Sequence, residues 1–372
     1  MILKVKKNTN KTKNVLQSLG GMSQGLFFTL IIGTIISQIG LLIGNNQVGI
    51  FVGNIGLYLK RILGVGIGLG IGLSLNQKGL KLLSITIMGF VSTIFKISFF
   101  NSDFYIPLFG DKLGTIGVNL DPLNIFLVTY IGYLILNKIL VKKTPVDILL
   151  IPLLSTIIAV ILTFIFSGIS GAVLFYISRF IDISTKAVPL LMVIIISLSM
   201  GILLTSPLSS AAIGIMISLG SNQIAAAAAI LGTTIQMIGL GFQGRKSNNA
   251  GVMISCMIGT SMFYFTNLIK KPLSWLPTLL TTILIAPIVL MLGIEGIPSD
   301  LVKQAWTLGS GMGSSGLVGQ IQTVFAMGVK NINTWLFIAI QVISSITLVY
   351  YFEVIFKRFN LISDDDLKIQ LL

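Results

Sequence analysis

Long runs of apolar residues with hardly any charge inside them limit what this chain can fold into. Of its 372 residues, 54% are hydrophobic and only 10% are charged. An ordinary soluble domain carries about 25% charged residues. A soluble globule of this length would therefore lack the charges that keep a surface hydrated, and we expect an integral membrane protein embedded in the lipid bilayer.

The apolar runs are long enough to cross a bilayer, which requires about 20 mostly apolar residues per helix. Ten segments qualify: Leu26–Ile43, Val48–Leu75, Leu80–Phe100, Leu123–Leu140, Ile148–Phe166, Val188–Leu204, Ile224–Phe242, Val252–Leu268, Trp275–Leu292 and Trp335–Phe356. The sequence therefore predicts an all-α polytopic membrane protein with about ten transmembrane helices.

The net charge of +14 comes from 25 basic and 11 acidic residues. Because the basic residues lie in short loops and tails, they indicate topology by the positive-inside rule rather than a nucleic-acid partner. Lysines 4, 6, 7, 11 and 13 precede the first run, and Lys357–Arg358 follow the last. An even number of spans agrees, so both termini are predicted to be cytoplasmic.

The charge rule fails at one place in the second half. Arg245–Lys246 and Lys270–Lys271 flank a single short apolar run, and a simple crossing cannot place both pairs inside. A re-entrant segment or a short additional crossing would resolve the conflict, and the sequence leaves both open.

Residue counts exclude several kinds of chemistry. The chain has no histidine, which excludes imidazole catalysis and histidine metal sites. Its one cysteine, Cys256, can form neither an intramolecular disulfide nor a cysteine-rich metal site. We therefore predict no metal, no cofactor and no catalytic residue, with Cys256 as a small core residue.

Three segments are neither clear spans nor clear loops. Ile169–Lys186 has apolar residues at helical spacing beside Arg179 and Asp182, which favours an interfacial amphipathic helix linking two halves. Thr205–Asn222 and Gly309–Gln320 are rich in small and hydroxyl residues between apolar stretches. Irregular backbone at membrane depth is typical of substrate cavities, so we favour two re-entrant hairpins over extramembrane loops.

Glycines alternate with aliphatic residues from Gly64 to Gly72. On a helix they form two ladders of small residues, which permit close backbone approach and favour tight packing or a subunit contact over a ligand site. In the last apolar run, Glu353 and Lys357 are spaced to form an ion pair within one helix.

Hydroxyl and amide residues of the two hairpins, and one glutamate between them, are the best groups for binding a solute. The candidates are Ser206, Ser209, Ser210, Gln236, Glu295, Ser314, Ser315 and Gln320. Glu295 would accept hydrogen bonds from substrate hydroxyls, and the serines and amides would complete the contacts. The alternatives are a solvated loop glutamate and amides that bond helices to one another.

Four blocks resemble a known family: PLSSAAIGIMISL (207–219), AAAAAILGTTIQMIGLGFQ (225–243), GTSMFYFTNLIKKPLSWLP (259–277) and GSGMGSSGLVGQIQT (309–323). They are similar to the enzyme IIC membrane component of the bacterial phosphotransferase system, in the subgroup of perfringolysin regulator-like proteins. The resemblance covers most of the chain and is strongest after Val188.

The resemblance implies a domain plan in the bacterial cell membrane. It divides the chain into a cytoplasmic tail (1–25), an N-terminal bundle that forms a homodimer (26–168), an amphipathic linker (169–187), a C-terminal substrate domain with hairpins near 205–222 and 305–323 (188–358), and a second cytoplasmic tail (359–372). Related transporters bind sugar in the hairpin domain, where a cytoplasmic IIB phosphocarrier phosphorylates it.

The chain departs from the sugar-transporting relatives in two respects. Those proteins generally carry a glutamate in a GITE-like motif, of which GIEGIP (293–298) is a degenerate version, and often a nearby histidine, which this chain lacks. The sequence thus favours a permease that moves a small polar solute, most simply a sugar, and needs a separate IIB partner for phosphotransfer. A membrane sensor that binds a ligand without transporting it is the alternative.

Overall fold

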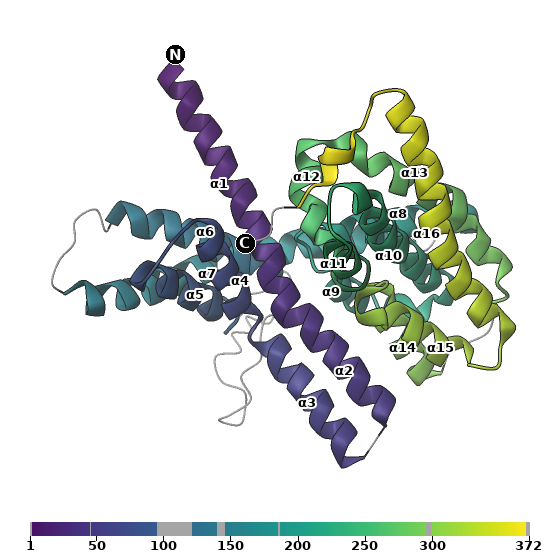
Figure 1. Ribbon diagram of the computed structural model, residues 1–372. Coiled ribbons are helices and arrows are strands. Elements are labelled where there is room, and N and C mark those ends of the chain that lie inside the picture. The colour runs from purple at the N-terminus through teal and green to yellow at the C-terminus, as the bar shows by residue number, and fades with distance from the viewer. Residues whose placement is uncertain are drawn as a thin grey trace. The chain divides into compact units, whose positions relative to one another are not determined.

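The computed structural model describes residues 2–44, 46–94, 121–139, 146–184, 187–294 and 299–369, and within these ranges every regular element is helical (Figure 1). Backbone contacts divide the chain into two compact units, Met1–Leu174 with Leu371–Leu372, and Phe175–Gln370.

The first unit is a bundle of apolar helices. A turn of π-helix, η1 (Phe27–Ile31), joins its first two helices without a loop. A bend of 50° separates its third helix from its fourth. The helices are α1 (Ile2–Leu26), α2 (Ile32–Ile43), α3 (Gln47–Arg61), α4 (Leu63–Ser74), α5 (Leu80–Val91), α6 (Pro122–Ile139) and most of α7 (Asp147–Ser184).

The glycine ladders of α4 pack against helices of the same chain. A Cβ atom added at Gly70 would overlap the carbonyl oxygen of Gly21 on α1, whereas one at Gly68 would lie 2.7 Å from the carbonyl oxygen of Ile85 on α5. One ladder therefore lets α4 approach α1, and the other lets it approach α5. The prediction of tight packing is confirmed, and these ladder positions are occupied inside the unit rather than left for a subunit contact.

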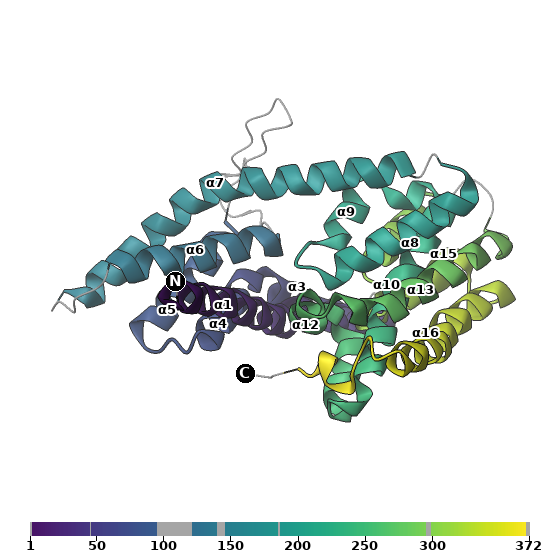
Figure 2. The same ribbon diagram turned by 90° about the horizontal axis from the view of Figure 1, so that it is seen from above.

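Helix α7 is longer than the sequence analysis predicts. A span ending at Phe166 and a separate amphipathic linker were expected, but α7 continues without a break to Ser184 (Figure 2). Its only proline, Pro152, is the sixth residue of the helix, so it removes one backbone hydrogen bond near the N-terminal end. No residue after it interrupts the hydrogen bonding, and the boundary between the two units falls within α7, after Leu174.

The second unit is built around helix α10 (Gln223–Gln243). In its most apolar window, 89% of the residues are buried, more than in any other candidate span among the described residues. Small residues permit this burial: Ser197 of α8 (Pro189–Thr205) donates a 2.7 Å hydrogen bond to the carbonyl oxygen of Ala228. Around α10 lie α8, α13 (Leu276–Ile285), α14 (Asp300–Ser310) and α16 (Ile332–Arg358).

Short helical pieces connect these longer helices. Between α8 and α10 lie α9 (Ser210–Met216) and η2 (Leu219–Ser221), and between α14 and α16 lie η8 (Ser315–Leu317) and α15 (Val318–Met327). Both Gly/Ser-rich segments thus consist of short helices joined by turns, and their re-entry into the membrane stays a prediction. The remaining pieces are η3 (Gly244–Lys246), α11 (Ala250–Ile254), η4 (Ser255–Gly259), η5 (Ser261–Tyr264), α12 (Phe265–Lys270), η6 (Pro272–Trp275), η7 (Ala286–Met291) and η9 (Asp364–Leu367).

The run expected to cross the membrane at Val252–Leu268 is bent back on itself. The chain bends by 120° between its two arms, 250–259 and 261–270. Asn248, before the first arm, donates a 2.8 Å hydrogen bond to the carbonyl oxygen of Leu367, and Asn267, near the end of the second, donates one of 2.8 Å to that of Lys368. Both ends of the segment therefore lie beside the same tail, so it is not a simple crossing.

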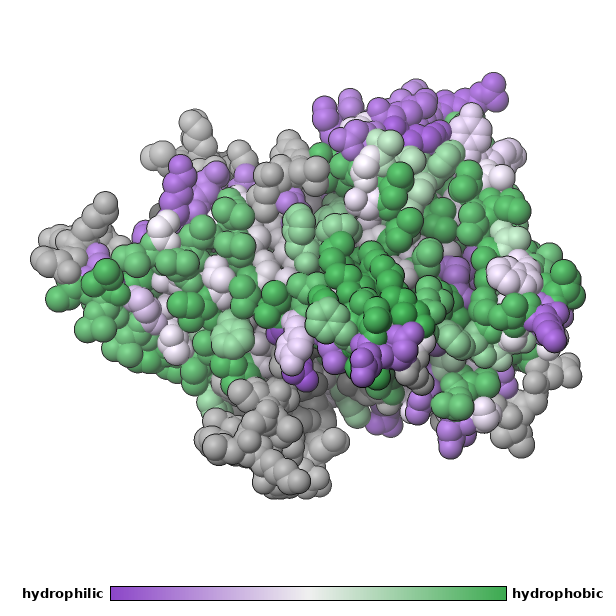
Figure 3. Space-filling view, turned by 60° about the horizontal axis from the view of Figure 1, so that its bottom comes forward, coloured by the Kyte–Doolittle hydropathy of each residue, from purple (hydrophilic) through white to green (hydrophobic). Residues whose placement is uncertain are grey.

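The described helices and their surface are those of a multi-pass membrane protein. Six helices are long and apolar enough to cross a bilayer, or eight if each bent pair is one span, and α5 and α8 are shorter apolar helices. Large apolar side chains are exposed along α3, α7 and α16, and in Figure 3 hydrophobic side chains form broad continuous areas. Such areas are unusual on a soluble monomer but suit contact with lipid. The count of ten spans remains a prediction.

Candidate functional site

The two Gly/Ser-rich segments, about a hundred residues apart in the chain, meet in the second unit. The buried hydroxyl of Ser210, at the start of α9, donates a 2.6 Å hydrogen bond to the carbonyl oxygen of Gly311, just after α14. The backbone N–H of Gly220 donates one of 3.1 Å to the hydroxyl of Thr307. The two Gly/Ser-rich segments are thus bonded to each other at two points.

The turn after α14 has a backbone that glycine makes possible. Gly313 and Gly316 have φ angles of 52° and 55°, in the left-handed region that residues with a Cβ atom rarely adopt. The turn is closed by a 2.7 Å bond from the N–H of Gly319 to the carbonyl oxygen of Gly313. This geometry holds Ser314 and Ser315 at the tip of the second segment.

The two serines of this tip are both buried, but only one has a hydrogen-bond partner among the described residues. Ser314 donates a 2.6 Å bond to the carbonyl oxygen of Met257, in the bent segment 250–270. The hydroxyl of Ser315 has no partner there. A buried polar group without a partner destabilises a fold and is uncommon in native proteins, so Ser315 is a position that calls for a functional reason.

Gln236 lies at the centre of a second polar group, on the buried helix α10. Its Oε1 accepts a 2.8 Å bond from the indole of Trp275 and a 3.0 Å bond from the hydroxyl of Thr278. Its Nε2 is buried and has no partner among the described residues. The bonds to Oε1 therefore fix the orientation of the Gln236 side chain, and Nε2 retains its capacity to donate.

Gln320 lies in a third group, in which three helices meet. Its Nε2 donates to the hydroxyl of Thr234 on α10 at 3.1 Å and to Oε1 of Gln341 on α16 at 2.8 Å. Neither Thr234 nor Gln341 is among the residues that the sequence predicts for the site. The one available signal was an amide near the middle of the last apolar run, where a polar side chain is expensive unless it faces protein.

The predicted site residues do not all share one place. Ser206, at the end of α8, donates only to the carbonyl oxygen of Leu203 in its own helix at 2.8 Å, which is a local structural contact. Ser209 precedes α9, and its carbonyl oxygen accepts the N–H of Ile213 at 3.1 Å. Glu295 lies outside the described residues. The hairpin contact joins Ser210 to the turn that carries Ser314 and Ser315.

These groups are hydroxyls and amides that carry no charge. Such a set can bind a neutral polyol through converging hydrogen bonds, but it offers no group suited to accept or release a proton near neutral pH. Among the described residues, no cluster of three or more Cys, Asp or Glu side chains has the arrangement of a metal site.

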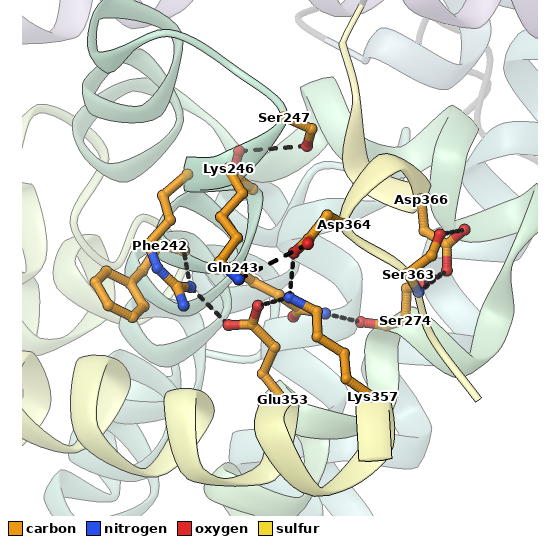
Figure 4. Close-up of polar contacts among 12 residues, drawn as sticks. Phe242, Gln243, Lys246, Ser247, Ser274, Glu353, Lys357, Ser363, Asp364 and Asp366 are labelled. Atoms are coloured by element: carbon orange, nitrogen blue, oxygen red, sulfur yellow. Dashed lines mark hydrogen bonds and ion pairs between the residues drawn. The ribbon is translucent and has the colours of Figure 1, made fainter. Parts of the chain in front are cut away.

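A charged cluster lies at the end of α16. The carboxylate of Glu353, only 1% exposed, pairs with Arg245 of η3 at 2.6 Å and with Lys357 one turn along its own helix. Lys357 also contacts Asp364 of the C-terminal tail, which Lys246 approaches at 3.7 Å (Figure 4). The predicted Glu353–Lys357 pair is confirmed, and Arg245 is an additional partner from 108 residues away.

The cluster is electrostatically coupled to the tail. The hydrogen bond from Lys357 holds the pKa of the Asp364 carboxyl below its ordinary value of 3.8, with further help from the charges of Lys357, Lys246 and Arg245. Asp364 begins η9, whose capping box is formed by Ser363 and Asp366. The C-terminal tail is thus held by the ion pairs of Asp364 and ordered by the capped helix η9.

The end of the tail is bound along the bent segment. The Asn248 side chain donates to the carbonyl oxygen of Leu367 and accepts a 2.8 Å bond from the N–H of Ile369. Leu367 itself is 2% exposed and packs into an apolar cluster with Leu240, Cys256 and Tyr264. Cys256 is therefore a buried core residue, as predicted.

Comparison with known proteins places the whole membrane part in one family. A protein-family model described as "Phosphotransferase system, EIIC" matches residues 16–369. Neither a curated protein nor a solved structure matches the chain. The match spans both structural units and includes all the polar groups described above, although it does not test the narrower perfringolysin regulator-like subgroup. The chain belongs to the EIIC family of the phosphotransferase system and is a membrane transport component of that system.

Proposed function

We propose that this EIIC protein carries a neutral sugar across the bacterial cell membrane and that the hairpin region of its second unit binds the sugar. The observation that carries this proposal is the Ser210–Gly311 bond, which joins the two Gly/Ser-rich segments. The second segment also bears Ser315 and Gln320, whose buried Oγ and Oε1 atoms have no partner among the described residues. Converging neutral donors and acceptors suit a polyol better than an ion.

Phosphorylation of the sugar would rest with a separate IIB protein acting at the cytoplasmic side. The chain has no histidine, and the hydroxyl and amide groups of the proposed site carry no charge, so these groups would bind and orient the sugar while the partner supplies the phosphoryl group. Glu295 remains a proposed acceptor for substrate hydroxyls. A homodimer formed through the first unit is part of the proposal and rests on the family resemblance.

Uptake by purified protein in liposomes tests this function. We expect labelled neutral hexoses, hexitols or disaccharides to enter protein-containing vesicles faster than empty vesicles, with retention as the phosphate ester when phosphorylated IIB is present. Binding without flux would instead indicate a sensor. Absence of both binding and flux across the sugar panel would overturn the proposal.

A further inference from the structure

The amide pair of Gln320 and Gln341 has hydrogen-bonding capacity that the fold does not use. Gln341 is completely buried, and its Oε1 accepts from Gln320 at 2.8 Å and from the hydroxyl of Thr234 at 3.4 Å. Its Nε2 is a buried donor without a partner among the described residues, and Oε1 of Gln320 is a buried acceptor without one. The bonded pair therefore presents one free donor and one free acceptor.

The presence of one free donor and one free acceptor does not depend on which atom of each amide is assigned as oxygen and which as nitrogen. Exchanging the two atoms in both side chains reverses the bond between the amides, yet again leaves one nitrogen and one oxygen unused. Two primary amides can give every nitrogen and oxygen of the pair a partner by forming two parallel bonds, but these form only one. Helix packing alone gives no reason to keep two buried polar atoms unpaired, because such atoms destabilise the protein.

We propose that Gln341, together with Gln320, is a substrate-binding residue that recognises hydroxyl groups of the transported sugar. A hydroxyl both donates and accepts, so adjacent hydroxyls complement the free donor of Gln341 and the free acceptor of Gln320. A carboxylate or phosphate only accepts, and the Gln320 oxygen would repel it. The pair thus selects neutral hydroxyls. This inference rests on the proposed function and adds α16 to the helices that supply the site.

The position of the pair suits a site that opens and closes. Gln320 lies on α15, directly after the turn that holds Ser315, whereas Gln341 lies on the membrane-spanning α16 and Thr234 on the central α10. Both free atoms are buried in this structure, which is therefore closed around them. Movement of the second Gly/Ser-rich segment relative to α16 would separate the amides and admit the sugar.

The variant Gln341→Met tests the inference, because methionine keeps the length of the side chain and removes the amide. With purified protein, binding is measured by thermal shift against a panel of neutral hexoses, hexitols and disaccharides. The sugar that stabilises wild type should bind the variant at least tenfold more weakly, a loss of about 1.4 kcal/mol. The melting temperature of the ligand-free variant should change little, because the removal of an unpaired buried donor offsets the loss of the bond from Gln320.

Two controls separate a substrate contact from a structural one. Ser344→Ala, on the same helix, removes a buried hydroxyl whose 2.6 Å bond goes to the carbonyl oxygen of Ile340, and it should leave sugar affinity unchanged. Among monodeoxy forms of the bound sugar, at least one should bind wild type more weakly but lose no further affinity in Gln341→Met. This non-additivity identifies the hydroxyl that the amide contacts.

The results that would overturn this inference differ from those that would overturn the proposed function. Equal sugar affinity in wild type and Gln341→Met would overturn the inference and leave the transport function standing. A lower melting temperature of the ligand-free variant together with unchanged sugar affinity would assign Gln341 a structural role instead. If wild type binds no sugar of the panel, the proposed function fails, and the inference fails with it.

Discussion

At the scale of single residues, Glu353 is the clearest case of a buried charge that depends on its partners. Replacing it with Gln keeps the shape but leaves Arg245 and Lys357 without their shared carboxylate. Breaking a buried ion pair costs about 3–5 kcal/mol, and the partial exposure of both cations favours the lower end. We expect a clear fall in melting temperature. Asp365→Asn, at an exposed tail position, is the matched control and should melt like wild type.

The sequence predicted some of these residue contacts and missed others for a physical reason. A pair four residues apart, such as Glu353 and Lys357, follows from helix geometry alone. The partnership with Arg245 and the contact of Ser210 with Gly311 depend on how distant helices pack, which local spacing does not encode. Gln341 was missed for the same reason, since its neighbours Thr234 and Gln320 come from two other helices.

The ion pairs of Asp364 predict how tail attachment depends on pH. Its carboxyl pKa is lowered in the folded protein by the hydrogen bond from Lys357, so the ionised form is stabilised there. This stabilisation is present above the unfolded pKa and is lost as the pH falls through the lower, folded value. Protease cleavage after Lys368 should therefore accelerate only below the ordinary value of 3.8. In Asp364→Asn, cleavage after Lys368 should be faster than in wild type at neutral pH. The cleavage rate of this variant should not rise at acid pH through titration of residue 364.

At the scale of elements, the packing of α4 sets a sharp limit on side-chain size. Gly70→Ala would place a methyl group against the carbonyl oxygen of Gly21, so α1 and α4 must separate. Overpacking of this kind destabilises by about 1–3 kcal/mol. Gly53→Ala on α3 is the matched control, because its added Cβ meets no atom within 4 Å. The control should be neutral or slightly stabilising, whereas equal melting of both variants would contradict the proposed close contact.

Elements were easier to predict than their ends and bends. The apolar runs located most of the long helices, because each must bury its backbone polar groups within lipid. Continuation of α7 to Ser184 was missed because polar residues after Phe166 resemble a change of environment, although they do not interrupt helical hydrogen bonding. The bend of 120° between 259 and 261 was one of two alternatives that the charge pattern left open, since an apolar run looks alike whether it crosses or returns.

At the scale of the whole molecule, the bent segment resolves the charge conflict left by the sequence. Arg245–Lys246 lie beside the tail through Asp364, and the 265–270 helix reaches it through Asn267. Lys357–Arg358 end α16 at the same place. Arg245–Lys246, Lys270–Lys271 and Lys357–Arg358 thus gather at one end of the second unit, which the positive-inside rule predicts to be its cytoplasmic end.

Accessibility of single cysteines in intact cells tests this orientation, in a background where Cys256 is replaced by serine. Helix α16 has 27 residues and is therefore about 40 Å long, enough to cross the bilayer, so Lys330 before its start should lie outside. A membrane-impermeant maleimide should label Lys330→Cys in intact cells but reach Lys270→Cys and Asp365→Cys only after lysis. Labelling of Lys270→Cys alone from outside would show that the 250–270 segment crosses the membrane. If both Lys270→Cys and Asp365→Cys are labelled from outside while Lys330→Cys is protected, the second unit has the opposite orientation to the one predicted.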